Sequence, residues 1–154
     1  MTLQEKLRRI KKIEDEYSPS DWDIYKENWI NSIKDLQNTI TYKWFGDYEN
    51  EKLMEFLLIP HKRDEAYIGQ YFISSLEITV ANNKTFLLEP ISAVTTQYDS
   101  KLEFSMLGNY NKRINILREI VGEKSKWIII NNDNDTPLEL TKVELENLIN
   151  KWLA

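Results

Sequence analysis

Apolar and polar residues follow two different periods along the chain, and the change between them separates a helical beginning from a strand-rich middle. Over residues 3–16 apolar side chains recur every three or four positions, and the same spacing returns from residue 20 to about residue 45. This spacing places apolar side chains on one face of an α-helix. We therefore predict two amphipathic helices, the second with Ser20 as its N-cap.

Large aromatic rings begin the apolar stripe of the second helix. The stripe steps by three and four residues through Trp22, Tyr25, Trp29, Ile33, Leu36 and Ile40. Stacking of such rings on nucleic-acid bases would need a basic groove around them, whereas the neighbouring Asp21, Asp23 and Glu27 are acidic. We therefore expect Trp22 and Trp29 to be buried, and the helix to pack on a sheet through them.

The period shortens to that of β-strands after a polar loop predicted at residues 46–51. The nearly continuous apolar run of residues 52–60 indicates a central strand. Residues 66–80 alternate in two halves whose phase changes at Ser74–Ser75, which indicates a bulge or a bend. A turn at residues 81–84 then leads into the next strand.

The rest of the chain predicts three more strands and two more helices. The strands are expected at residues 85–94, 100–107 and 126–132, and the helices at residues 109–122 and 141–154. Thr141 and Glu144 have the spacing of a capping box at the start of the last helix. Together these elements predict a single α+β domain over residues 1–154, with N-terminal helices packed on a largely antiparallel meander and further helices at the C-terminus.

Composition narrows the classes of protein that remain. The 154 residues include no cysteine, which excludes disulfides, thiolate zinc sites and cysteine nucleophiles. The first residues lack the apolar run of a secretory signal, and no segment reaches the roughly 20 apolar residues of a membrane span. We therefore expect a soluble, cytoplasmic protein without membrane contact.

Candidate catalytic residues are few. His61, the one histidine, follows the predicted strand and is expected to be an ordinary loop residue. The chain has no phosphate-binding glycine motif. A calcium loop from Asn131 would place Thr136 and Lys142 where a tight-turn glycine and a bidentate glutamate belong. We predict no enzyme activity, cofactor or metal; a small hydrolase or transferase that uses carboxylates and His61 is the open alternative.

Acidic residues outnumber basic ones by 25 to 20, and the net charge is −5. A general nucleic-acid binder carries a basic footprint, so we expect no direct contact with nucleic acid. Carboxylates gather in two segments that could dock a basic protein. The predicted partner-binding residues are Asp47, Glu49, Glu51, Glu55, Asp133 and Asp135. The alternative interpretation is that both segments are solvated surface.

One stretch, "SDWDIYKENWINSIKDL", resembles the entry helix of immunity proteins from bacterial contact-dependent growth inhibition systems. In that helix, aromatic and aliphatic positions correspond here to Trp22, Tyr25, Trp29, Ile33 and Leu36. Ile24 stands where the family has an acidic residue. The resemblance continues through the strands and the Asn-Asn turn, over roughly residues 18–90.

The resemblance implies an antitoxin-like protein that binds a cognate toxin domain, usually a nuclease, and blocks its active site or substrate path. It implies no catalysis by this chain and supplies no contact residues. Small size, acidity and the scarcity of catalytic clusters agree with it. A phage or secretion-associated adaptor is the other open alternative, and the oligomeric state is not predicted.

Overall fold

The protein is described by a computed structural model that covers residues 2–154 except 82, 96–98 and 132–133, with backbone only at residues 131, 134 and 135. Its helices are α1 (Leu3–Glu16), α2 (Pro19–Asn38), the π-helix η1 (Thr39–Trp44), α3 (Gly46–Asn50) and α4 (Lys142–Leu153). Its strands are β1 (Met54–Glu65), β2 (Gly69–Val80), β3 (Lys84–Ser92), β4 (Ser100–Met106), β5 (Arg113–Val121), β6 (Lys124–Asn131) and β7 (Asn134–Glu139).

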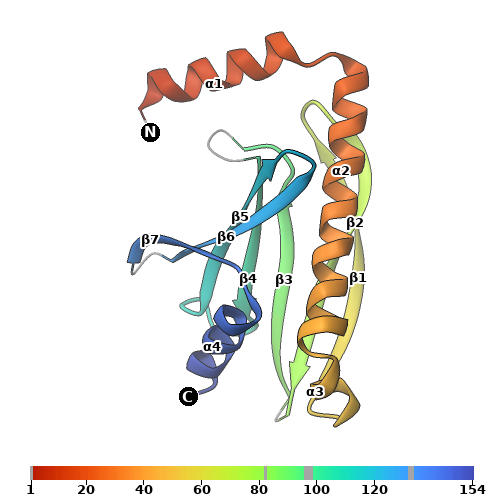
Figure 1. Ribbon diagram of the computed structural model, residues 1–154, viewed down its shortest axis with the longest axis vertical. Coiled ribbons are helices and arrows are strands. Elements are labelled where there is room, and N and C mark those ends of the chain that lie inside the picture. The colour runs from red at the N-terminus through yellow and green to blue at the C-terminus, as the bar shows by residue number, and fades with distance from the viewer. Residues whose placement is uncertain (1, 82, 96–98, 132–133) are drawn as a thin grey trace.

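The strands form one seven-stranded sheet whose spatial order is the order of the chain (Figure 1). Every neighbouring pair is antiparallel. The predicted α+β class, with N-terminal helices and an antiparallel meander, is therefore confirmed. A single helix, α4, follows the sheet, so the C-terminal half is less helical than predicted.

Helix α2 runs the length of the sheet, as the long apolar stripe predicts (Figure 1). It begins two residues earlier than expected, because Ser18 and not Ser20 is the N-cap. The Asp21 N–H donates to Ser18 Oγ at 3.2 Å, and the Ser18 N–H donates to the Asp21 carboxylate at 2.9 Å. Pro19 occupies the first helical position, where its missing N–H leaves no unpaired donor.

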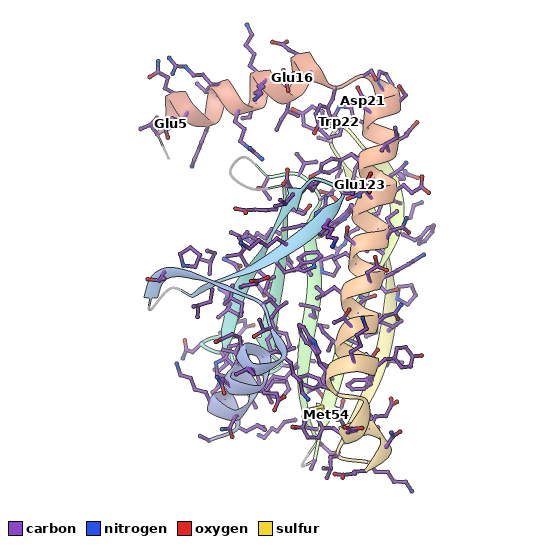
Figure 2. The ribbon with its side chains drawn as sticks, viewed as in Figure 1. Glu5, Glu16, Asp21, Trp22, Met54 and Glu123 are labelled. Atoms are coloured by element: carbon purple, nitrogen blue, oxygen red, sulfur yellow. The ribbon has the colours of Figure 1, made fainter. Side chains whose placement is uncertain are left out.

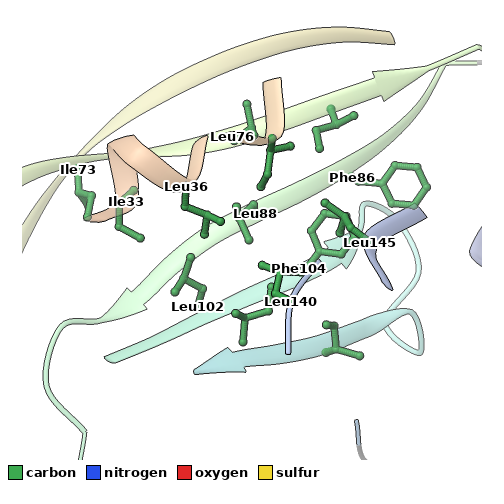
Figure 3. Packing of buried hydrophobic residues seen from close by; sticks show 14 of the residues in the cluster. Ile33, Leu36, Ile73, Leu76, Phe86, Leu88, Leu102, Phe104, Leu140 and Leu145 are labelled. Atoms are coloured by element: carbon green, nitrogen blue, oxygen red, sulfur yellow. The ribbon is translucent and has the colours of Figure 1, made fainter. Parts of the chain in front are cut away.

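The rings of α2 lie in the core, which confirms the predicted burial. Trp22 and Tyr25 are buried, and Trp29 has no exposed surface. Figure 3 shows Ile33 and Leu36 of the same helix facing Leu76 and Leu88 of the sheet. The stripe therefore joins α2 to the sheet by apolar burial, the dominant favourable term in folding.

Three aromatic rings pack together at the corner between α1 and α2. Trp22 lies between Tyr17, with ring centroids 4.5 Å apart, and Tyr67 of the β1–β2 turn, at 4.8 Å. The Tyr67 hydroxyl also donates to Glu14 of α1 at 3.0 Å. The rest of α1 extends away from these contacts (Figure 1), and it has no buried residue. Helix α1 is thus confirmed, while Leu3 at the start of its apolar stripe is 71% exposed.

Helix α4 fills the other part of the same core. Phe86, Phe104 and Trp152 stack with nearly parallel rings, the centroids of Phe104 and Trp152 being 5.6 Å apart. At the start of α4, the Glu144 N–H donates to Thr141 Oγ1 at 3.2 Å, which confirms Thr141 as the N-cap. None of the helices among the described residues has the length and apolar character that a membrane crossing requires.

The helix predicted over residues 109–122 is wrong, because Arg113–Val121 form β5 between β4 and β6. Ile114, Ile116 and Arg118 are its buried positions and repeat with the period of two of a strand. An arginine at the third position disguises this alternation, since arginine is almost never fully buried unless paired. Strand β7 was missed too, because no strand was predicted between residue 132 and the helix expected at residues 141–154.

Strand β1 is an edge strand and not the predicted central strand. Its apolar run suggested cover on both faces, but Leu57 and Leu58 are both exposed. The alternation of buried and exposed side chains shifts by one residue between Leu57 and Leu58 of β1. In β2 it shifts between Ser75 and Leu76, and Leu76 pairs with Leu58. The β1–β2 register is unbroken, so the predicted phase change is not a bulge. It falls where β2 stops pairing with β3, and free two-stranded ribbons twist strongly.

Trp29→Ala should lower the free energy of unfolding by about 3–5 kcal/mol, because it leaves a cavity in the core. Urea denaturation of the purified protein measures this change. Ile24→Ala, at a position of the same helix that is 67% exposed, is the matched control and should change stability by about 0.5 kcal/mol or less. Equal effects of the two substitutions would contradict the burial of the ring.

Candidate functional site

The first acidic segment forms a short helix, α3, where a polar loop was predicted. Phe45 is fully buried just before this helix, and Tyr48 is half-buried within it, their ring centroids 5.8 Å apart. Residues three apart share one helix face. Asp47 and Glu49 consequently point to solvent, because the two rings anchor the opposite face to the core.

A contact with α4 adds a further carboxylate to this end of the molecule. The Tyr48 hydroxyl donates to Glu146 Oε2 at 3.1 Å, and Lys142 Nζ lies 3.8 Å from the other oxygen of Glu146. The hydrogen bond to Glu146 and the nearby charges of Glu146, Glu51 and Asp47 raise the pKa of Tyr48 above its usual range. The hydroxyl of Tyr48 is thus the contact that joins α3 to α4 at this end.

A groove of about 290 Å³ lies between α3, the start of β1 and α4. Phe45, Met54, Ile149 and Leu153 form the apolar part of its lining, and Tyr48, Glu146, Asn147 and Asn150 form the polar part. Met54 marks this end of the molecule in Figure 2, and Glu5 and Glu16 of α1 mark the opposite end. We call Asp47, Glu49, Glu51, Glu55 and Glu146, together with this groove, the acidic end.

The predicted carboxylates of the acidic end are open to a partner. Asp47, Glu49, Glu51 and Glu55 are all exposed. The ion pairs among the described residues are Arg63–Glu89 and Lys142–Glu146, so none of these four carboxylates is neutralised within that part of the chain. Glu146, which the site prediction omitted, is brought to the segment by a contact across 98 positions of sequence.

The second acidic segment includes β7, at the other edge of the sheet. Asp135 belongs to β7, the last strand in the sheet order, whereas Glu55 belongs to β1, the first. Asp133 falls outside the described residues, and the side chain of Asp135 is likewise not described. Asp135 and Glu55 therefore lie on strands at opposite edges of the sheet, whereas Glu146, at the end of the second segment (133–146), lies beside the first.

His61 lies within β1, opposite Ile73, and not in the predicted loop. It is half-buried, and no hydrogen bond joins its imidazole to another described residue. Across the described ranges, no three histidine or carboxylate side chains gather closely enough to hold a metal ion.

A buried polar network between α2 and the sheet is the feature that the sequence did not reveal. Arg118 has no exposed surface, and its guanidinium lies 5.4 Å from the ring centroid of Tyr25 and 5.1 Å from that of Trp29. It donates from Nε to Ser100 Oγ at 2.9 Å and from Nη1 to Asn28 Oδ1 at 2.8 Å. Burial lowers the pKa of Arg118 below its ordinary value.

The network continues through the backbone of Ala93 to the half-buried carboxylate of Glu65. Ala93 O accepts from Tyr25 at 2.7 Å and from Ser100 at 2.6 Å, while the Ala93 N–H donates to Glu65 Oε1 at 2.9 Å. Glu65 also accepts from the Tyr71 hydroxyl, which in turn accepts from Trp29 Nε1 at 3.2 Å. Burial and the bond to Glu65 raise the pKa of Tyr71 above its usual range, and burial raises that of Tyr25.

This network has the character of a structural clamp, since its polar groups face one another inside the protein. The acidic end, by contrast, presents four unpaired carboxylates and a groove of mixed apolar and polar lining, and it is the candidate functional site.

No protein-family model matches the chain, and no curated protein or solved structure gives a significant match.

Arg118→Ala should cost about 2–5 kcal/mol of stability, because it leaves a cavity and buried acceptors without a donor. Arg113→Ala, at an exposed position of the same strand, is the control and should cost about 0.5 kcal/mol or less. Chemical denaturation of both variants tests the difference, and a fully stable Arg118→Ala protein would contradict the role of the guanidinium.

Stability should fall as the pH rises above about 10, the ordinary pKa of tyrosine. The raised pKa values of Tyr25 and Tyr71 mean that the folded protein keeps its phenol protons where the unfolded chain has released them. Tyr71→Phe should make this alkaline decline shallower in denaturant titrations at increasing pH. The exposed Tyr42→Phe should leave it unchanged; identical slopes in both variants would contradict the assignment.

Proposed function

We propose that this protein is an immunity protein that binds a cognate toxin domain in the cytoplasm and neutralises it. The partner is expected to be a basic domain, a nuclease, whose active site or substrate path is blocked in the complex. The observation that supports this function best is the acidic end, where the exposed and unpaired carboxylates of Asp47, Glu49, Glu51 and Glu55 accompany a groove that Glu146 lines. The resemblance of the α2 stretch to the entry helix of such immunity proteins supports it independently.

The chemistry of the acidic end fits a cationic protein surface. A nuclease carries a positive surface because it must hold phosphates. A negative surface of the inhibitor would attract that surface over a distance and speed the encounter. The apolar part of the groove lining includes Phe45, Met54 and Ile149, and the aliphatic stem of a lysine or arginine could pack against it. The charged head of that side chain would then lie beside Glu146.

Inhibition needs only that the bound inhibitor cover the phosphate-binding surface of the toxin. The carboxylates would then occupy the place of substrate phosphates, and no group of this chain would undergo chemistry. Asp135, on the last strand of the sheet, would need a separate part of the partner to reach it.

Neutralising the acidic end should slow association with the toxin while the fold stays intact, because exposed charges contribute little to stability. The variant Asp47→Asn, Glu49→Gln, Glu51→Gln is compared with the wild-type chain in binding kinetics against the toxic domain of its own locus, over a series of salt concentrations. The association rate should fall with the substitution, and its dependence on salt should become weaker.

The matched control removes the same number of charges elsewhere. Asp15→Asn, Asp23→Asn, Glu27→Gln changes three exposed carboxylates of α1 and α2, and it should have a smaller effect on association. Co-expression tests the function itself, since the chain should protect cells that produce the toxic domain. Absence of both a complex and protection would refute the immunity function. Protection with an association rate that ignores salt and the triple substitution would refute only the acidic-end mechanism.

A further inference from the structure

A second groove, of about 430 Å³, lies along α2 on the side of the β5–β6 hairpin. Helix α2, the π-helix η1 and the start of β6 form its walls, and Figure 2 marks Glu123, one of its lining residues, beside α2. It shares no residue with the groove of the acidic end. Its volume lies within the range of sites that hold small organic ligands.

The π-helix places a tryptophan in this groove. The apolar stripe of α2 reaches Ile40, and α-helical spacing would bring Trp44 into the core next. In η1 the Phe45 N–H instead donates to Ile40 O at 2.9 Å, five positions back, so Phe45 takes the core position and is fully buried. Trp44 is left half-buried and lines the groove. Such turns are rare and occur frequently at functional sites.

Strand β6 supplies the second ring of the groove. Trp127 is half-buried and lines the wall that faces α2. Leu36 and Leu140 are the other apolar lining residues, and all the rest are polar. The groove therefore combines two indole rings with a majority of hydrogen-bonding side chains.

Arg118 holds two of the polar side chains in fixed orientations. Its Nη1 donates to Asn28 Oδ1 at 2.8 Å and to Ser32 Oγ at 3.1 Å. Because the oxygen of Asn28 is engaged, its amide nitrogen remains as a donor. Ser32 Oγ also lies 2.9 Å from Ser125 Oγ, which lines the groove from the other wall. These groups are in place before a ligand arrives, which lowers the entropic cost of binding.

Further polar groups of the groove are free to bind a ligand. Asn31, Asp35 and Thr39 follow one another at four-residue intervals, about 6 Å apart along the helix axis. No hydrogen bond joins their side chains to another described residue. Glu123 and Lys124 form no ion pair within the described part of the chain. The groove thus offers a row of donors and acceptors beside two aromatic rings.

This combination selects the chemical class of the ligand. A phosphate or another anion would meet Asp35 and Glu123, which outnumber the one cation of the lining, Lys124. An apolar ligand would leave amides and hydroxyls without partners, which is costly. A sugar ring has a face of C–H groups that packs on an indole, and its hydroxyls both donate and accept hydrogen bonds.

We infer that this groove binds a neutral mono- or disaccharide built of six-membered rings. One ring face lies on Trp44 or Trp127, and hydroxyls bond to Asn28, Asn31 and Asp35. The inference does not rest on the proposed function, because none of the residues of the acidic end lines this groove.

Saturation-transfer NMR and calorimetric titration of the full chain test the inference with named probes. These are the methyl glucosides, galactosides and mannosides, N-acetylglucosamine, maltose, cellobiose and lactose, each to roughly 20 mM. At least one should bind, change the tryptophan emission and raise the unfolding temperature in proportion to its affinity. D-Sorbitol, which has the hydroxyls but no ring face, should bind at least about tenfold more weakly.

Substitutions on α2 locate the bound sugar. Asn31→Ala with Asp35→Ala should weaken binding at least about tenfold, because one lost hydrogen bond to a charged group has that effect. Asp23→Ala with Asn38→Ala is the matched control and should keep the affinity. All four positions are exposed, so both variants should unfold as the wild type does without sugar.

Three results would overturn the inference. The first is that none of the named sugars binds at roughly 20 mM. The second is a bound sugar whose affinity ignores the substitutions at Asn31 and Asp35, or that sorbitol matches. The third is that inorganic phosphate or spermidine binds in the groove while the sugars do not, because the site would then recognise an ion.

Discussion

The buried guanidinium of Arg118 connects the long helix to the middle of the sheet, and the arrangement of the other elements depends on that connection. It projects from β5 and lies against the rings of Tyr25 and Trp29 on α2. No carboxylate forms an ion pair with it among the described residues. Burying such a charge is costly, and the cost is offset by the faces of the two rings and by hydrogen bonds to both layers. These directional contacts fix how α2 crosses the sheet, which apolar burial alone does not specify.

The Arg118 network, which holds α2 on the sheet, also bears on which parts of the sheet stay exposed. With α2 and α4 in one core, the first and last strands remain as edges of the sheet. Each edge strand contains a proline, Pro60 in β1 and Pro137 in β7. Prolines and charges at edges limit uncontrolled pairing. The stretch of β1 before Pro60 carries the exposed charge of Glu55 and no proline.

The acidic end and the open edge of β1 are neighbouring surfaces that would attract partners through different interactions. At the acidic end, exposed carboxylates act over a distance and favour fast encounter with a cationic partner. Along the edge, backbone groups and leucines act only in contact and demand one register. Glu55 lies at the boundary between the two.

The sequence by itself determined the features that depend on neighbours three or four positions away. The stripe from Trp22 to Ile40 predicted α2 and its buried face, and Thr141 predicted the start of α4, because helical spacing and capping are local. The tertiary structure determined the features that depend on contacts between residues far apart in the sequence. Strand β5 was mistaken for a helix because Arg118 is buried only by partners such as Asn28, 90 positions away. The edge position of β1 and the union of Glu146 with the first acidic segment also arise from contacts that no local pattern encodes, since strand order and the packing of α3 on α4 are set by the whole chain.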